Sequence, residues 1–275
     1  MSRIAIVTGA NQGLGFALVE GLARRLEPAD TVYLTGRDAG RISDAAKRIA
    51  GTRAQVRERV LDVRDRAAIG RFAEELGGAD ILFSNATGRM SPDRSWAEQI
   101  DAQVEISNLS TTSILRAFHP LLRPRGRLII VASSLGVLSK LSPHLRGRFD
   151  APDLTLDGLD AIVLAWRDAV RDGRAADEGW PDWINIPSKV AQVAAVRVLA
   201  RERREHGAPA GSLVAAVCPG LIDTEASRTW FADMSRAQTP AQAAEALLRL
   251  ALEDPVDPRY EGELVRSGDV VPWRG

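Results

Sequence analysis

The first elements that the chain predicts are a buried strand and an amphipathic helix, joined by a glycine-rich turn. Residues 4–7 (Ile-Ala-Ile-Val) form an apolar run, which is typical of a parallel strand covered on both faces. Beyond the turn, apolar side chains recur at helical spacing over residues 16–26. The turn itself contains Gly9, Gly13 and Gly15. The chain therefore opens with the order strand, glycine turn, helix.

The same alternation continues along most of the chain. Further strands are expected at 31–35, 54–63, 79–88, 126–134, 212–217 and 262–265, and further helices at 64–76, 96–122, 188–206 and 239–252. Strands that alternate with helices pack as a parallel sheet with helices on both faces. We therefore expect an α/β fold with a Rossmann-type, doubly wound parallel sheet of about seven strands. No stretch resembles a linker that would divide it, so the pattern predicts a single domain over 1–275.

A helical insertion at about 137–182 interrupts the alternation and is longer than the usual connection in such a fold. Within it, Leu159, Val163 and Trp166 share one helical face, and Gly173 is the expected stop. That apolar face must cover another part of the molecule. The substrate cleft and a blocked subunit interface are both open as interpretations.

Composition and charge favour a small-molecule partner. Lys+Arg and Asp+Glu both total 36, so no overall field favours nucleic acid or a membrane surface. The one cysteine, Cys218, excludes an internal disulfide and fits a reducing compartment. The first strand follows Met1-Ser2-Arg3 directly, and no run of about 18 apolar residues is present. We expect a cytoplasmic protein without a signal peptide, a membrane span or a metal site.

The glycine turn predicts a nucleotide site. Glycines at such a junction let the backbone approach a diphosphate, and the free N–H groups at the helix start favour an anion. The alternative is a tight turn without a ligand. At the end of the second strand, Arg37 and Arg41 are placed to accept a 2′-phosphate, which favours NADPH over NADH. The alternative is that both arginines lie on a solvated helix start and bind no phosphate.

Two further strand ends face the predicted nucleotide. Asp62 follows the third strand and is placed to accept from the adenine amino group, or else to cap the helix over 64–76. The fourth strand finishes in Asn85 and Ala86, which are small enough to let a cofactor lie against the chain. Asn108 lies within the long helix over 96–122. Because asparagine is a poor residue for a helix interior, a buried Asn108 must hydrogen-bond a specific partner.

With these motifs in place, the chain resembles the short-chain dehydrogenase/reductase family over nearly its whole length, and within it the carbonyl reductase-like branch that has a large insertion. Residues 8–15 (TGANQGLG) are similar to the family's Thr-Gly-x-x-x-Gly-x-Gly cofactor turn. Ser84-Asn85-Ala86 resembles its Asn-Asn-Ala-Gly motif, with Ser84 and Thr87 as departures. Further similarities to the branch are Arg37-Asp38 with Arg41, Cys218-Pro219-Gly220, Glu178-Gly179-Trp180-Pro181, and Gly262-Glu263-Leu264-Val265 with Trp273.

The resemblance implies NADPH or NADP as the cofactor and a cofactor-binding set along the strand ends. This set is Gly9, Asn11, Gln12, Gly13, Leu14, Gly15, Arg37, Arg41, Asp62, Val63, Asn85, Ala86, Lys189, Pro219, Gly220 and Thr224. By resemblance to the insertion-bearing branch, a monomer is expected.

The family's active site is a tetrad of Asn, Ser, Tyr and Lys, and the resemblance places three of these residues. Asn108, Ser133 and Lys189 match Asn, Ser and Lys. The residue four before the lysine, where the family has tyrosine, is Asn185. The motif over 178–181 fixes this register without a gap.

The replacement by Asn185 removes the group that gives a proton to the carbonyl oxygen. An amide donates a hydrogen bond but does not transfer a proton in practice. The chain's two tyrosines, Tyr33 and Tyr260, are predicted to lie away from the site. An iminium or a conjugated acceptor accepts hydride without immediate protonation of an alkoxide. The other sources of a proton that remain open are Ser133, a water molecule, His144, Asp150, Asp153 and Asp157.

Three hypotheses on function follow. The favoured one is an NADPH-dependent reductase of a bulky, apolar carbonyl, enone or imine, with an altered proton path and with Ser133, Lys189, Asn108 and Asn185 in the site. The second is a non-redox dehydratase, isomerase or cyclase that keeps the nucleotide as a scaffold. The third is a non-enzymatic NADPH sensor. The side chains expected to line the substrate pocket, or else to pack in the core or a lid, are Trp180, Trp183, Trp230 and Phe231.

Overall fold

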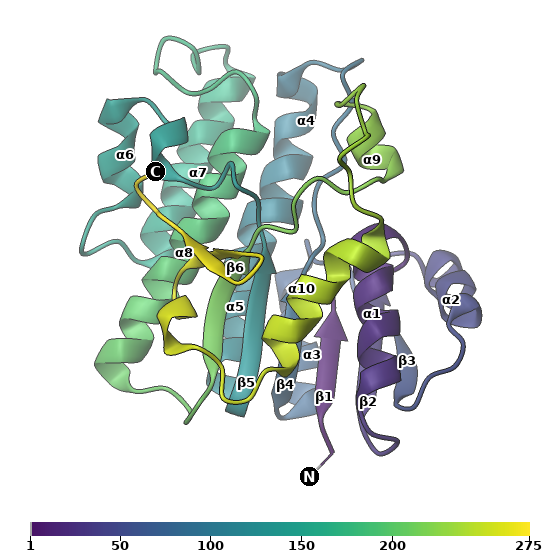
Figure 1. The fold of residues 1–275 in the computed structure, drawn as a ribbon. Coiled ribbons are helices and arrows are strands. Elements are labelled where there is room, and N and C mark those ends of the chain that lie inside the picture. Colours follow the sequence, from purple (N-terminus) through teal and green to yellow (C-terminus); the bar gives the residue numbers. More distant parts are fainter. Residues whose placement is uncertain (1) are drawn as a thin grey trace.

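The computed structural model describes residues 2–275, which fold around an eight-stranded sheet with the order β3-β2-β1-β4-β5-β6-β7-β8 (Figure 1). Strands β1 to β7 pair in parallel and β8 pairs with β7 in the antiparallel sense. The predicted doubly wound α/β sheet is confirmed. The eighth strand was not predicted; its three residues are mostly exposed and carry no apolar run. The strands are β1 (Ile4–Val7), β2 (Thr31–Gly36), β3 (Gln55–Val60), β4 (Ala79–Ser84), β5 (Leu122–Val131), β6 (Leu213–Val217), β7 (Leu264–Arg266) and β8 (Asp269–Val271).

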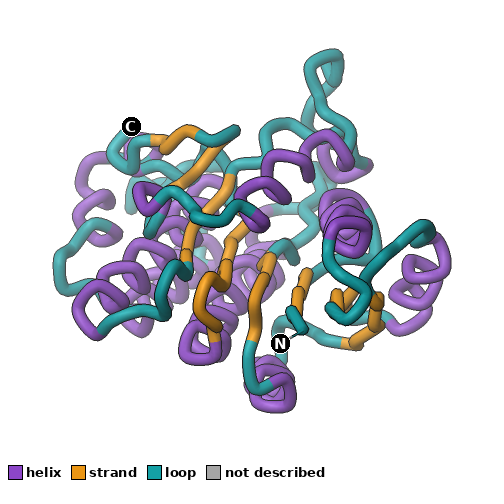
Figure 2. Tube along the Cα trace, turned by 60° about the horizontal axis from the view of Figure 1, so that its bottom comes forward, coloured by secondary structure: helices purple, strands orange, loops and turns teal. Residues whose placement is uncertain are grey.

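Helices cover both faces of the sheet (Figure 2). Successive side chains of a strand point to opposite faces. In β1, Ile6 belongs to one apolar core, and Ala5 and Val7 belong to the other. One face is covered by α1 (Gly13–Arg25), α2 (Ala39–Arg48) and α10 (Pro240–Leu252), and the other by α3 (Arg66–Leu76), α4 (Trp96–Gln103), α5 (Ser110–Phe118) and α8 (Asn185–His206).

The predicted helix over 96–122 is wrong in its continuity and its end. A π-helical segment, Val104–Leu109, separates α4 from α5, and the helix gives way to a short 3-10 turn at His119–Leu121 before β5 begins. Hydroxyls that follow the π segment donate to carbonyls within it, including Ser110 to Ile106 and Thr111 to Ser107. Such bonds compete with regular helix pairing and favour a local widening.

The insertion forms two helices, α6 (Pro143–Phe149) and α7 (Leu156–Arg171), of which α7 was predicted. Gly173 follows α7 with a φ of +72°, as expected for the residue that ends a helix. The apolar face of α7 packs on α4 and α8, and the fully buried Trp166 anchors it. The insertion therefore covers the outer side of these two helices (Figure 1).

Candidate active site

The predicted functional residues gather at the carboxyl ends of β1, β4, β5 and β6. In the sheet β1 lies between β2 and β4, so the strand order reverses at this point. In doubly wound sheets the connections on either side of such a reversal leave in opposite directions and open a crevice, where ligands bind. The glycine turn after β1 and Asn85 after β4 form the two sides of this crevice.

Hydrogen bonds of Thr8 and Asn85 join the two loops. The Thr8 hydroxyl oxygen accepts from the backbone N–H of Asn85 at 2.9 Å and of Ala86 at 3.1 Å. The Asn85 side-chain amide donates to the carbonyls of Thr8 and Gly9 at 3.0 and 3.2 Å. These bonds fix the shape of the glycine turn from the neighbouring strand.

The turn fits a dinucleotide pyrophosphate. Gly9 has a φ of +62°, and a Cβ on Gly15 would lie 2.5 Å from the Gly9 carbonyl oxygen, so neither position accepts a side chain. Helix α1 begins at Gly13, and the side chain of the preceding Gln12 makes no capping bond. The first N–H groups of α1 are therefore free to bind an anion. The Thr224 methyl lies close to this turn, 3.6 Å from where a Gly13 Cβ would lie.

The adenosine end of the predicted site contains more arginines than the sequence motifs indicated. Arg41 donates to the Gln12 side chain at 2.7 Å, and Arg37 is exposed beside it. Arg48, which was not predicted, donates to the Asn11 carbonyl and stacks on Phe16. Its signal was its position on the same helix as Arg41, seven residues further on. The structure thus places three guanidinium groups around the turn and the end of β2.

Asp62 does not cap the helix after β3, so the capping alternative is wrong. The cap of α3 is Asp65, which accepts from the Ala68 N–H. Asp62 instead pairs with Arg64, and hydrogen bonds from Arg64 lower the pKa of the Asp62 carboxyl, with a smaller contribution from the charge of Arg37. Asp62 thus lies just beyond the carboxyl end of β3, ionised and bonded to Arg64, close enough to Arg37 for its charge to act. Val63 beside it is buried.

Asn108 lies in the π-helical segment and bonds to the start of α8. Its amide donates to the Ser188 carbonyl at 2.8 Å, and the Ser188 hydroxyl donates to its side-chain oxygen at 3.0 Å. Gln103 donates to the same hydroxyl. The predicted specific partner of Asn108 is therefore Ser188, and this bond locks the segment that holds Lys189.

Lys189 is buried at the carboxyl end of β5. Its ammonium donates to the Val131 carbonyl at 3.3 Å and to the Gln192 side chain at 2.7 Å, and Gln192 donates in turn to Thr111. Burial lowers the pKa of Lys189 from 10.5 to about 8, against a smaller opposing contribution from Cys218. Gln192 was missed from the sequence, where a glutamine on a mostly apolar helix gives no sign of its partner.

Ser133 lies two residues beyond the carbonyl that binds Lys189, so both residues lie at the carboxyl end of β5. The Ser133 hydroxyl oxygen accepts from the Leu135 N–H at 3.3 Å, which leaves its own hydrogen free to donate. Cys218, at the end of the neighbouring β6, accepts from the Ser134 N–H. Beyond it, the Pro219 carbonyl accepts from Gln238, and Gly220 has a φ of +82°.

Asn185 is the first residue of α8, one helical turn before Lys189 and on the same face. It is half-buried, and its side chain makes no hydrogen bond within residues 2–275. Both tyrosines interact with residues outside this site: Tyr33 packs edge-on against Phe72, and the Tyr260 hydroxyl donates to the Gly268 carbonyl.

The aspartate and histidine side chains considered as other proton sources are either exposed or bonded to residues in and around the insertion. Asp150 accepts from the Trp273 indole and pairs with Arg274, and Asp157 pairs with Arg116. Asp153 is exposed. His144 bonds the Glu178 carbonyl.

The aromatic side chains expected at the substrate pocket divide into two groups. Trp180 is buried against Phe149 and Trp166, which is core packing of the insertion. Trp183 and Trp230 lie together, with ring centroids 6.1 Å apart, and Trp230 also stacks on Trp96 at 5.8 Å. These three rings, Trp96, Trp183 and Trp230, are called the tryptophan cluster below. Phe231 is 42% exposed beside it.

The tryptophan cluster joins three elements at one end of the sheet. Trp96 begins α4, Trp183 lies two residues before α8, and Trp230 follows α9 (Glu225–Arg228). Trp96 was not predicted as a site residue, because its position at a helix start gave no sign of its partners. All three rings are partly exposed.

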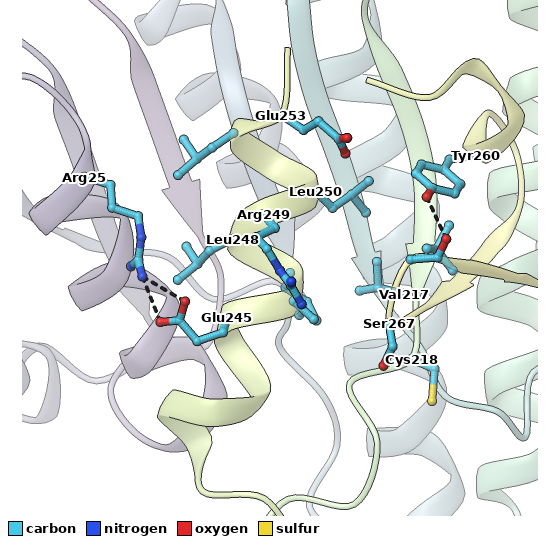
Figure 3. Close-up of a pocket in the computed structure, with 15 residues that line it drawn as sticks. Arg25, Val217, Cys218, Glu245, Leu248, Arg249, Leu250, Glu253, Tyr260 and Ser267 are labelled. Carbon is cyan, nitrogen blue, oxygen red and sulfur yellow. Dashed lines mark hydrogen bonds and ion pairs between the residues drawn. The ribbon is translucent and has the colours of Figure 1, made fainter. Parts of the chain in front are cut away.

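A separate cavity of about 540 Å³ lies between α10 and the β6–β7 edge (Figure 3). Arg25 and Glu245 pair at one side of it, while Tyr260 and Cys218 form part of the other. It lies on the α1 and α10 face, whereas Asn185 and Lys189 belong to α8 on the other face.

The sheet order, the glycine turn and the position of Ser133 and Lys189 at the end of β5 define a dinucleotide-binding protein of the Rossmann class. The chain belongs to the short-chain dehydrogenase family, as predicted: the family's model, described as short chain dehydrogenase, matches residues 3–142. Carbonyl reductase [NADPH] 1 of Sus scrofa is 31% identical over 99% of this chain and 94% of its own. Carbonyl reductase [NADPH] 3 of Rattus norvegicus is 30% identical over 99% of both chains.

Solved structures agree in fold. Salutaridine reductase from Papaver somniferum superposes with a TM-score of 0.79 at 24% identity, covering 95% of this chain and 99% of its own. Menthone neomenthol reductase from Mentha piperita gives 0.75 at 22% identity, covering 98% and 100%. No helix among residues 2–275 combines the length and apolar character needed to cross a bilayer.

Proposed function

We propose that this protein is an NADPH-dependent oxidoreductase that reduces a bulky, largely apolar carbonyl, enone or imine and uses a proton path without tyrosine. The observation that supports it most is the position of Lys189: its ammonium is bound to the Val131 carbonyl, two residues from Ser133, at the carboxyl end of β5, with β4 between this strand and the glycine turn after β1. Burial of a lysine without a carboxylate partner costs stability, which favours a functional role for Lys189.

The choice of NADPH rests on Arg37, Arg41 and Arg48 around the end of β2 and on the relatives, which are named as NADPH carbonyl reductases. A guanidinium fork matches the geometry of a phosphate. When bound, NADPH supplies a hydride. Gly9, Gly13 and Gly15 would hold its pyrophosphate, and the arginines its 2′-phosphate.

The side chains at the end of β5 polarise and orient the group to be reduced. The free hydrogen of the Ser133 hydroxyl donates to the substrate oxygen or nitrogen, and Asn185 offers an amide donor from the start of α8. Asn108 holds the α8 start through Ser188. The tryptophan cluster supplies an apolar wall.

We also propose that the chain acts as a monomer, because the insertion helix α7 covers the outer side of α4 and α8. The sheet edge at β3 carries Arg57, Glu58 and Arg59, which disfavour pairing with a second sheet. Light scattering is expected to give a single species near 29.7 kDa.

The test is NADPH oxidation against a panel of ketones, enones and cyclic imines, with wild type and Asn185→Tyr in parallel. Turnover by the wild type with one NADPH consumed per product supports the reductase. Product formation without NADPH loss would favour the non-redox enzyme. Tight NADPH binding with no reaction in either protein would favour the sensor.

A further inference from the structure

Reduction of a neutral ketone leaves an alkoxide that must receive a proton, and Asn185 stands where the family has the tyrosine that gives it. Asn108 and Asn185 are amides, and the Ser133 hydroxyl is a very weak acid. The Lys189 ammonium donates to Val131 and Gln192 and makes no hydrogen bond to Ser133 or Asn185 among residues 2–275, so no acid is bonded to the groups that would hold the substrate oxygen. Loss of a matched general acid costs about 10² to 10⁴ in rate.

An iminium cation removes this requirement. Hydride adds to the carbon of the C=N⁺ bond, the π electrons become a lone pair on nitrogen, and a neutral amine results. NADPH is oxidised to NADP⁺ and the iminium is reduced, so atoms, electrons and charge balance without any proton donor.

The surroundings of the site also suit a cation. Aromatic faces attract cations through the ring quadrupole, and tryptophan does so most strongly. The charged groups of the neighbouring α9 segment are paired: Glu225 bonds Arg89, and Asp223 bonds Arg228. The tryptophan cluster is therefore not next to unbalanced positive charge from this segment.

The positive charge of Lys189 would repel such a substrate unless neighbouring groups compensate it. Its charge is held against the Val131 carbonyl and the Gln192 side-chain oxygen, both of which carry partial negative charge. Burial also lowers the pKa of Lys189 to about 8, so its neutral form is more accessible than that of an exposed lysine.

We propose that the substrate of this site is a cyclic iminium cation held by the tryptophan cluster, and that Asn185 replaces tyrosine because this reaction needs no acid. The inference rests on the proposed NADPH-dependent reduction and names its substrate class.

Three probes of nearly equal shape test the chemistry: N-methyl dihydroisoquinolinium, α-tetralone and dihydroisoquinoline. We expect wild type to reduce the permanent iminium with a kcat/KM at least about 100-fold above that for the ketone, after subtraction of the enzyme-free rate. In Asn185→Tyr the ketone rate should rise by about 10² or more while the iminium rate changes less than about threefold.

Equal rates for iminium and ketone in the wild type would overturn the inference and leave NADPH-dependent reduction standing. Ketone reduction by Asn185→Tyr, with none of the probes reduced by the wild type, would overturn both the inference and the proposed reduction. If neither protein oxidises NADPH with any of the probes, the proposed reduction fails as well. Dihydroisoquinoline separates the effect of the C=N bond from the effect of the positive charge, because it has this bond but is charged only when protonated.

Binding provides a readout that does not depend on turnover. By calorimetry we expect N,N-dimethyl tetrahydroisoquinolinium to bind about tenfold more tightly than its neutral isostere, dimethyltetralin. Trp230→Leu should remove this preference, and Trp230→Phe, which keeps an aromatic face, should retain most of it. Equal affinity for the two ligands, or a preference that survives Trp230→Leu, would contradict the role of the tryptophan cluster.

Discussion

The proposed chemistry depends on Asn185. The family's motif spacing predicted that Asn185 stands where the tyrosine is, but the helix was expected to begin at Ser188, and α8 begins three residues earlier, at Asn185 itself. What the sequence could not predict was the bonding of Lys189 itself. The Val131 carbonyl meets it only through the packing of α8 on β5, whereas Gln192 is its neighbour one turn further along α8, a spacing that the sequence shows without indicating a bond.

Lys189 gives a prediction with a definite sign. Its pKa in the folded state is about 8, below the ordinary value of 10.5, so between these pH values the unfolded chain binds more protons. The free energy of unfolding should therefore rise with pH over this window, by up to roughly 3 kcal/mol relative to Lys189→Met. Urea denaturation of both proteins at several pH values measures it.

Parallel pH curves for wild type and Lys189→Met between pH 8 and 10.5 would show that Lys189 keeps an ordinary pKa in the folded protein. Its ammonium would then be better solvated than its burial indicates. If the free energy of unfolding of wild type relative to Lys189→Met falls as the pH rises, the folded state holds the proton more tightly than the unfolded chain.

At the scale of elements, apolar periodicity predicted strands β1 to β7 and the insertion helix α7, but it did not predict breaks within helices. The segment 96–122 keeps a helical period throughout, yet it contains a π segment and ends at Phe118. The cause is hydrogen bonding by serine and threonine hydroxyls, together with Pro120, rather than hydrophobic pattern. Similarly, Asp62 and Asp65 are equally good caps by type, and only the backbone geometry selects Asp65.

Helix α7 should depend on Trp166. This side chain is 1% exposed and contacts Trp180 within the core of the insertion. Trp166→Ala should lower the free energy of unfolding by about 3 to 5 kcal/mol, because it removes buried apolar area and leaves a cavity. Phe231→Ala, at a ring that is 42% exposed, should cost about 1 kcal/mol or less in the same urea titration. Equal costs for the two changes would show that the insertion does not pack on Trp166.

At the scale of the whole molecule, the sheet order brings together residues that are distant in sequence. Thr8 and Asn85 are hydrogen-bonded across the ends of β1 and β4, and Lys189 bonds the end of β5, because the carboxyl ends of these parallel strands lie at one edge of the sheet and α8 packs against it. The family resemblance placed all of these residues in one site. The tryptophan cluster was only partly predicted, since Trp96 joins it through the placement of α4 beside the α9 segment.

We propose that this site transfers a hydride although it lacks the tyrosine. The most direct measurement of this transfer uses NADPH with both hydrogens at the reactive carbon replaced by deuterium, a reactive probe from the panel, and mass spectrometry of the product. We expect one deuterium in each product molecule and one NADPH oxidised for each. A product formed without deuterium, at constant NADPH, would contradict it and identify the nucleotide as a scaffold.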